Sequence, residues 1–230
     1  MIKNLKLKIK NSSAGITLVE LVVVIFIIGL FSVILISDFP KIERQFALSR
    51  VTYKLAQDLR RAQDLGLSGV PTADINGDTI AVKGYGLYVN YGDSNTKYVI
   101  YADVPGAPDV NGVRNSDQKY SGDLSYPLCE KVDPAINGTL ISDCVVSLVD
   151  ISKENPSLYI KGVTTTSGDT TVSTTGGVSI NFRPPNPNTS ISDESNVPLH
   201  SSVSIIFGLK TDNAAARMVS ANTFGLIEVK

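Results

Sequence analysis

Glu20 is the only ionisable residue in an otherwise apolar stretch, 16–37, near the start of the chain. A charged side chain within a membrane helix costs about 2.5–3.5 kcal/mol on insertion scales, so such a residue usually has a partner or lies near an interface. Two roles follow from its chemistry. Glu20 either pairs with a cationic group and sets the register between helices, or it stabilises its own helix N-terminus through the helix dipole, by about 0.3–1 kcal/mol.

His200 and the segment 74–78 are the other candidates for a functional site. Neither is accompanied by the residues that a known catalytic or calcium site needs. His200 is the only histidine, with no cysteine or acidic cluster at ligand spacing and no Gly-x-Ser-x-Gly motif, so we expect no catalytic residues and no enzymatic activity. Asp74-Ile75-Asn76-Gly77-Asp78 resembles the start of a calcium loop, but Tyr85 stands at the twelfth position, where a bidentate Glu is needed. We interpret this segment as an Asn-Gly turn and expect no metal, cofactor or small-molecule substrate.

The stretch 16–37 has the length of a membrane span. About 22 residues at about 1.5 Å per residue cover the roughly 30 Å hydrocarbon core. The lysines before Gly15 predict a cytoplasmic N-terminus and place everything after residue 37 outside the cytoplasm. A cleaved secretory signal would have a shorter apolar region and a small-residue cleavage site, and a plain anchor would not need Glu20. These lysines are Lys3, Lys6, Lys8 and Lys10.

The chain contains two cysteines, Cys129 and Cys144, and both lie in the part expected outside the cytoplasm. A disulfide persists in such a compartment, so we predict a bond between them. The alternative is two unpaired thiols.

A second helical pattern follows the apolar stretch. Pro40 predicts a kink or local melting, because proline lacks the backbone N–H that the helix needs. Apolar residues then recur at spacings of two to four until Gly66, Gly69 and Pro71 end the pattern. This stripe is expected to be the surface on which a globular domain packs, with a coiled-coil seam as the alternative. Its members are Phe46, Leu48, Val51, Leu55, Leu59, Ala62 and Leu65.

After Pro71 the periodicity changes from helix to strand. Strict alternation at 178–182 and 203–207 predicts half-buried strands, and 92–95 is a natural hairpin connection between two strands. The predicted fold is α+β: a long N-terminal helix, half membrane-spanning and half amphipathic, packed against an antiparallel β-sheet domain. The predicted strands are 85–91, 97–102, 144–149, 157–163, 170–174, 178–182, 203–209, 216–220 and 226–229.

The N-terminal residues carry a family resemblance. Lys10-Asn-Ser-Ser-Ala-Gly15 followed by Ile16-Thr17-Leu18-Val19-Glu20 and a long aliphatic run resembles the processing site of type IV prepilins and type II secretion pseudopilins. The resemblance implies that a prepilin peptidase cleaves between Gly15 and Ile16 and that Ile16 becomes the N-methylated residue. It also implies that Glu20 pairs with the amine of a neighbouring subunit during assembly. The family more often has Phe at the position of Ile16.

The resemblance divides the chain into a leader peptide, 1–15, a transmembrane and stem helix, 16–68, and a globular β-domain, 69–230. The order of features after the stem, including Phe182-Arg183-Pro184-Pro185 and the closing segment 217–229, resembles the minor pseudopilins of the GspH/FimT class. The implied partners are other pilin or pseudopilin subunits, the prepilin peptidase and the bacterial inner membrane. The implied protein is a structural subunit of a type IV pilus or of a secretion pseudopilus, with its β-domain periplasmic or extracellular.

The alternative to a purely structural subunit is a DNA-binding minor pilin for natural transformation, and the charge of the chain tests this alternative. The formal net charge of −1 includes the four leader lysines, so the processed chain is more acidic. Phosphate contacts need clustered Lys and Arg, and the chain ends Leu226-Ile-Glu-Val-Lys230 without a basic tail. We therefore do not expect nucleic-acid binding.

Overall fold

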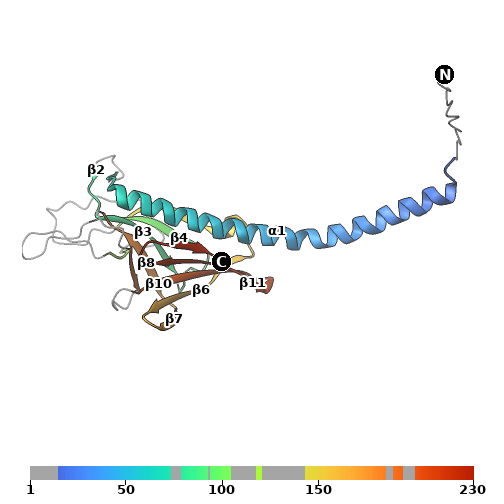
Figure 1. Cartoon of the computed structure of the whole chain (residues 1–230). Helices are drawn as coiled ribbons and strands as arrows, with labels where there is room; N and C mark the ends of the chain where they lie inside the picture. Colours follow the sequence, from blue (N-terminus) through green and yellow to red (C-terminus); the bar gives the residue numbers. More distant parts are fainter. Residues whose placement is uncertain are drawn as a thin grey trace, which may run out of the picture. The chain divides into compact units, whose positions relative to one another are not determined.

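The computed structural model describes residues 15–73, 79–92, 94–104, 118–120, 143–184, 189–193 and 200–230. The chain divides into two compact units, Met1–Glu43 and Arg44–Lys230. Each unit is described by itself. Figure 1 shows the elements, of which the helix α1 (Leu18–Ser68) belongs to both units.

Helix α1 confirms the predicted helix in extent. It ends at Ser68, and Gly69 follows in the left-handed region with φ 59° while its N–H donates to the Leu65 carbonyl at 3.1 Å. This is the usual glycine stop of a helix. The predicted local melting at Pro40 is wrong, because the helix continues through this residue. One proline removes one hydrogen bond from a 51-residue helix, and the neighbouring bonds remain.

Two five-stranded antiparallel sheets make up most of the second unit. The first has the order β5-β4-β3-β8-β9 and the second the order β12-β11-β10-β6-β7. In the first sheet the strands are β3 (Gly84–Asn90), β4 (Lys97–Asp103), β5 (Cys144–Asp150), β8 (Gly177–Phe182) and β9 (Thr189–Asp193). In the second they are β6 (Leu158–Ser167), β7 (Thr170–Thr174), β10 (Ser202–Leu209), β11 (Asp212–Asn222) and β12 (Ile227–Val229). A two-stranded sheet, β1 (Thr72–Ala73) with β2 (Thr79–Ile80), and a 3-10 turn, η1 (Ile151–Lys153), complete the described elements.

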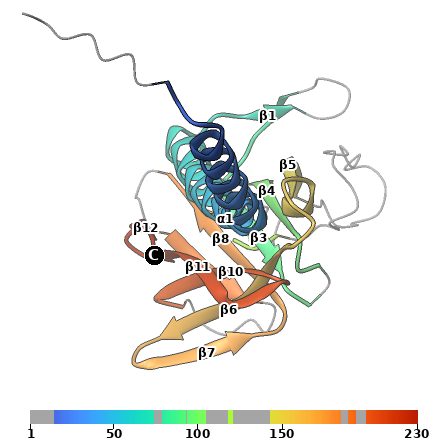
Figure 2. The same cartoon turned by 90° about the vertical axis from the view of Figure 1, so that its right-hand side faces the viewer.

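The α+β fold class is confirmed: the second half of α1 packs on the sheets, as Figure 2 shows looking along the helix. One core cluster joins helix residues such as Leu55 and Leu59 to Ile180 of the first sheet and Phe207 of the second.

The apolar stripe predicted on the second half of the helix is correct for Leu48, Val51, Leu55, Leu59 and Ala62, which are at most 3% exposed. The prediction that Phe46 belongs to this stripe is wrong. Its side chain is 68% exposed, because it lies two positions before Leu48 and residues two apart do not share a helix face.

The helix lies very close to the first sheet at Gly66. A Cβ placed on Gly66 would clash with the Phe182 carbonyl oxygen. No side chain fits in that space, so glycine is needed where the last turn of α1 meets the end of β8.

Strands β8 and β10 were predicted to be half-buried. In β10 partly exposed and buried residues alternate over its first six residues, as predicted, but for β8 the prediction is wrong, because every residue of β8, like every residue of its neighbour β3, is buried. The face away from the helix is covered by a tyrosine cluster, in which the rings of Tyr88 and Tyr120 lie 4.8 Å apart and Tyr101 is fully buried. Strand β9 is absent from the predicted strands, because it lies in the segment 183–202, which is rich in Pro, Ser and Asn and has no strand periodicity.

Buried tyrosines make the second unit sensitive to alkali. Burial raises the pKa of Tyr98, and the hydrogen bond from its hydroxyl to Asp58 Oδ2 at 2.7 Å raises it further. Burial, followed by the nearby Asp143 and Asp103, raises the pKa of Tyr101 well above its ordinary value. Because these pKa values are raised in the folded state, the associated stability is complete below the unfolded tyrosine pKa of about 10 and falls as pH rises above it.

We therefore expect Tyr98 and Tyr101 to ionise only as the domain unfolds. In an alkaline titration, the rise in tyrosinate absorbance that belongs to the buried tyrosines should coincide with the loss of far-UV circular dichroism above pH ~10. Tyr98→Phe should reduce the amplitude of that cooperative step. Full tyrosine ionisation with the circular dichroism unchanged would contradict the expectation.

Candidate assembly site at the start of helix α1

Thr17 and Glu20 form a reciprocal capping box at the start of α1. The Glu20 carboxylate accepts from the Thr17 backbone N–H at 3.0 Å and from the Thr17 hydroxyl at 2.9 Å, both through Oε2. The Glu20 N–H in turn donates to Thr17 Oγ1 at 3.2 Å. The Thr17 carbonyl accepts from Leu21 N at 3.2 Å, which makes Thr17 the N-cap residue.

This geometry shows one of the two roles that the sequence leaves open for Glu20. In the chain by itself, the carboxylate satisfies the N-terminus of its own helix. The other oxygen, Oε1, takes part in no hydrogen bond or ion pair with the described residues, and the side chain is exposed. A carboxylate has acceptor capacity beyond these bonds. Glu20 can thus cap its helix and still accept a cationic group.

Gly15 and Ile16, the predicted cleavage residues, directly precede the capping box. Both are exposed, and a Cβ added to Gly15 would meet no atom within 4 Å. Ile16 is 77% exposed. The peptide bond between them is therefore accessible in this unit, three residues ahead of the first turn of α1.

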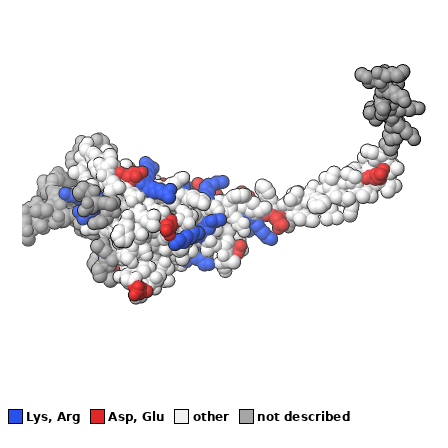
Figure 3. All heavy atoms as spheres, viewed as in Figure 1, with Lys and Arg blue, Asp and Glu red and all other residues white. Residues whose placement is uncertain are grey.

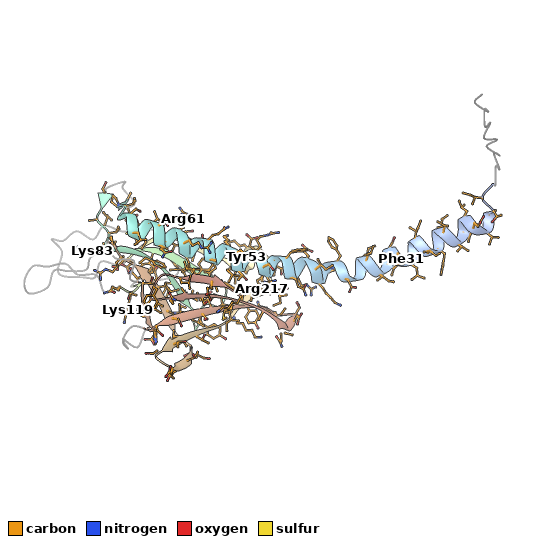
Figure 4. The ribbon with its side chains drawn as sticks, in the orientation of Figure 1. Phe31, Tyr53, Arg61, Lys83, Lys119 and Arg217 are labelled. Carbon is orange, nitrogen blue, oxygen red and sulfur yellow. The ribbon has the colours of Figure 1, made fainter. Side chains whose placement is uncertain are left out.

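The first part of α1 has apolar side chains around its whole circumference. Phe31, labelled in Figure 4, is 64% exposed, and the large aliphatic residues between Leu21 and Ile36 are also exposed. A helix that is apolar all round and unpacked fits a lipid environment. By length and composition, α1 is long and apolar enough to cross a membrane.

Several predicted residues lie outside the described part of the chain. These are the leader residues before Gly15, the Asp74–Asp78 turn and Cys129. Cys144 is described, at the start of β5, and it is disulfide-bonded. The pairing of Cys144 with Cys129 stays a prediction.

His200 lies beside a residue that sequence reasoning did not connect with it. His200 Nε2 is 3.1 Å from Asp193 Oδ2, and the His200 N–H donates to the Ile191 carbonyl at 3.0 Å. Both side chains are largely buried between β9 and the start of β10. The pair connects these two segments. Within the described ranges, no group of three or more His, Cys, Asp and Glu residues is placed to hold a metal ion.

Thr17 is the functional residue whose role sequence reasoning missed. The Thr-x-x-Glu spacing before an apolar run is the signature of a capping box, so the signal was present in 17–20. Both roles predicted for Glu20, charge pairing and stabilisation of the helix dipole, concern its carboxylate and leave the Thr17 side chain out.

The charged residues on the second unit are of mixed sign. On the face drawn in Figure 3, blue Lys and Arg side chains alternate with red Asp and Glu side chains among the described residues. Arg50 and Lys54 on α1, for example, lie 3.4 Å and 3.9 Å from the Glu154 carboxylate. This face does not present the single-sign surface that DNA phosphates require.

Comparison with known proteins adds no assignment. No protein-family model matches the chain, and no curated protein or solved structure shows significant similarity to it.

Proposed function

We propose that the chain is a prepilin-like structural subunit, processed between Gly15 and Ile16 and assembled through α1 into a pilus or a type II secretion pseudopilus. The observation that carries this proposal is the sequence Gly15-Ile16-Thr17-Leu18-Val19-Glu20 at the start of a long, all-round apolar helix. The accessible Gly15–Ile16 peptide and the exposed Glu20 carboxylate support it. Within this proposal, the chain resembles the minor pseudopilins of the GspH/FimT class.

The proposed mechanism begins in the inner membrane, with the basic leader in the cytoplasm and the β-domain outside. Hydrolysis of the Gly15–Ile16 bond exposes the Ile16 amine, which the peptidase methylates. The Glu20 carboxylate then pairs with the amine of a neighbouring subunit, so that two charges that are costly in lipid neutralise each other. The apolar helices bundle inside the filament, and the β-domains face outward.

Processing is tested by the mass and N-terminal sequence of the mature protein from a host that has a prepilin peptidase. We expect a mature chain that begins at Ile16 with a methylated amine. Gly15→Val should prevent cleavage, because the added side chain blocks the position that the peptidase reads. Ile16→Phe is the matched control: it changes the adjacent residue to the one more common in the family and should leave cleavage intact. A mature N-terminus at another residue would refute the proposal.

A further inference from the structure

Among the described residues, strand β7 is an open edge of the second sheet. It pairs with β6 through five consecutive residue pairs without a register shift, and no described residue pairs with its other side. All five residues, Thr170-Thr171-Val172-Ser173-Thr174, are uncharged. Four of them are exposed, and Val172 is 54% exposed. Regular, uncharged edges without proline or bulges are the ones that add another strand.

In the described ranges, the other edges of the two five-stranded sheets each have a protecting feature. Strand β12 has three residues, and Glu228 forms a salt bridge with Lys230 at 2.9 Å. The outer side of β9 is occupied, because Thr189 N–H donates to the Thr223 carbonyl and His200 N–H donates to the Ile191 carbonyl.

The two remaining edges are interrupted or charged. The ladder between β4 and β5 has a register shift between Ile100 and Tyr101, and such irregularities disfavour pairing with a further strand. Strand β11 extends past β12, and the extension, from Asp212 to Arg217, has a charged residue at each end. In addition, Lys161 Nζ donates to the Asn213 carbonyl at 2.7 Å. Strand β7 therefore differs from the other described edges of the two five-stranded sheets.

The hydrogen-bond pattern identifies the backbone groups on the open side. Gly168 and Asp169 form a two-residue turn in which Gly168 has φ 59°, and the pair Ser167 and Thr170 closes it. A two-residue hairpin turn is closed by a hydrogen-bonded pair, and bonded and non-bonded pairs then alternate. The N–H and C=O groups of Thr171 and Ser173 consequently point away from β6.

We propose that β7 is a homodimerisation edge, through which two copies of the chain pair antiparallel about Val172 and continue the second sheet across both copies. In this register, Thr171 forms a hydrogen-bonded pair with Ser173 of the partner subunit, and Val172 lies opposite the partner's Val172. Strand addition of this kind derives its affinity from main-chain hydrogen bonds.

A second copy is the occupant that the sequence of β7 fits. Self-pairing brings no like charges together, because the strand carries none. It places valine opposite valine and hydroxyl side chains opposite each other, which are favourable cross-strand pairs. A two-fold interface requires a patch that is complementary to itself, and this strand meets that condition. The proposal does not depend on the proposed function.

Cysteine cross-linking of the full chain in membranes tests the register. Val172→Cys should give a disulfide-linked dimer on a non-reducing gel after mild oxidation, because residues opposite each other at a non-hydrogen-bonded position are close enough to bridge. Thr171→Cys alone should give no more dimer than the unsubstituted chain, whose Cys144 is already disulfide-bonded. Co-expression of Thr171→Cys with differently tagged Ser173→Cys should restore a mixed dimer, since those positions are opposite each other.

Proline substitution tests the edge itself. Adding Ser173→Pro to Val172→Cys should abolish the cross-link, because it removes an outward N–H that β6 does not use. Ser173→Ala retains that N–H and should leave the cross-link unchanged. Far-UV circular dichroism of both variants checks that the domain is folded. Equal cross-linking of Thr171→Cys and Val172→Cys, no dimer at all, or a Val172→Cys adduct with a different protein would overturn the proposal.

Discussion

Glu20→Gln is expected to be processed normally but to be lost from assembled filaments. The glutamine retains the acceptor oxygen that the capping box needs, so α1 should still begin at Leu18, but it has no charge to pair with a neighbouring amine. Removing one partner of a buried ion pair costs about 3–5 kcal/mol, which is more than about 100-fold in an equilibrium. The measurement is the amount of the chain in a sheared or crosslinked filament fraction, relative to the amount of processed protein in the membrane.

Thr17→Ala is the matched control for this experiment. It removes the hydroxyl that donates to Glu20 Oε2 at 2.9 Å and accepts from the Glu20 N–H, but it leaves the carboxylate in place. Loss of an N-cap costs about 0.5–2 kcal/mol, and lipid stabilises the rest of the helix, so assembly should decrease little. Equal loss of assembly in both variants would show that Glu20 acts only as a cap. Normal assembly of Glu20→Gln would remove the pairing role altogether.

Leu55→Ala is expected to destabilise the second unit by about 2–5 kcal/mol. Leu55 is fully buried in the cluster that joins α1 to both sheets, so truncation leaves a cavity on three sides. The measurement is the free energy of unfolding from denaturant titration of the full chain in detergent. The near-UV circular dichroism of the buried tyrosines reports on the second unit rather than on the apolar first part of α1.

Phe46→Ala is the control for the packing of the helix. Phe46 belongs to the same helix but is 68% exposed, and exposed substitutions usually change stability by less than about 0.5 kcal/mol. A loss with Phe46→Ala as large as that with Leu55→Ala would mean that the helix packs in a different rotation about its axis.

Local periodicity was sufficient to predict most of the elements. The three- and four-residue spacing from Leu48 to Ala62 predicts the buried side of α1, and two-residue alternation predicts β8 and β10, because both patterns follow directly from backbone geometry. Periodicity fails where tertiary contacts decide. Ser179 and Asn181 are polar, yet they are buried, because the tyrosine cluster covers their face of the sheet.

The candidate site was predictable in its residues, and the Thr-x-x-Glu spacing also carries the signal for its capping contact. Glu20 is conspicuous because a lone charge in an apolar run is costly, and its bonds with Thr17 form where the helix begins at Leu18. Asp193 and His200 are separated by a segment with no periodicity, and their pairing depends on β9, a strand that the surrounding Pro-, Ser- and Asn-rich sequence concealed.

The close contact between Gly66 and the Phe182 carbonyl adds a backbone contact to the side-chain packing through which a pull along α1 would reach the sheets. At this point no side chain of the helix separates its backbone from that of β8. Strand β8 is held by six pairs with β3 on one side and five with β9 on the other. A load directed along such ladders acts on many hydrogen bonds at once instead of opening them one after another. The C-terminal turn of α1 therefore contacts a strand of the first sheet that is paired on both sides.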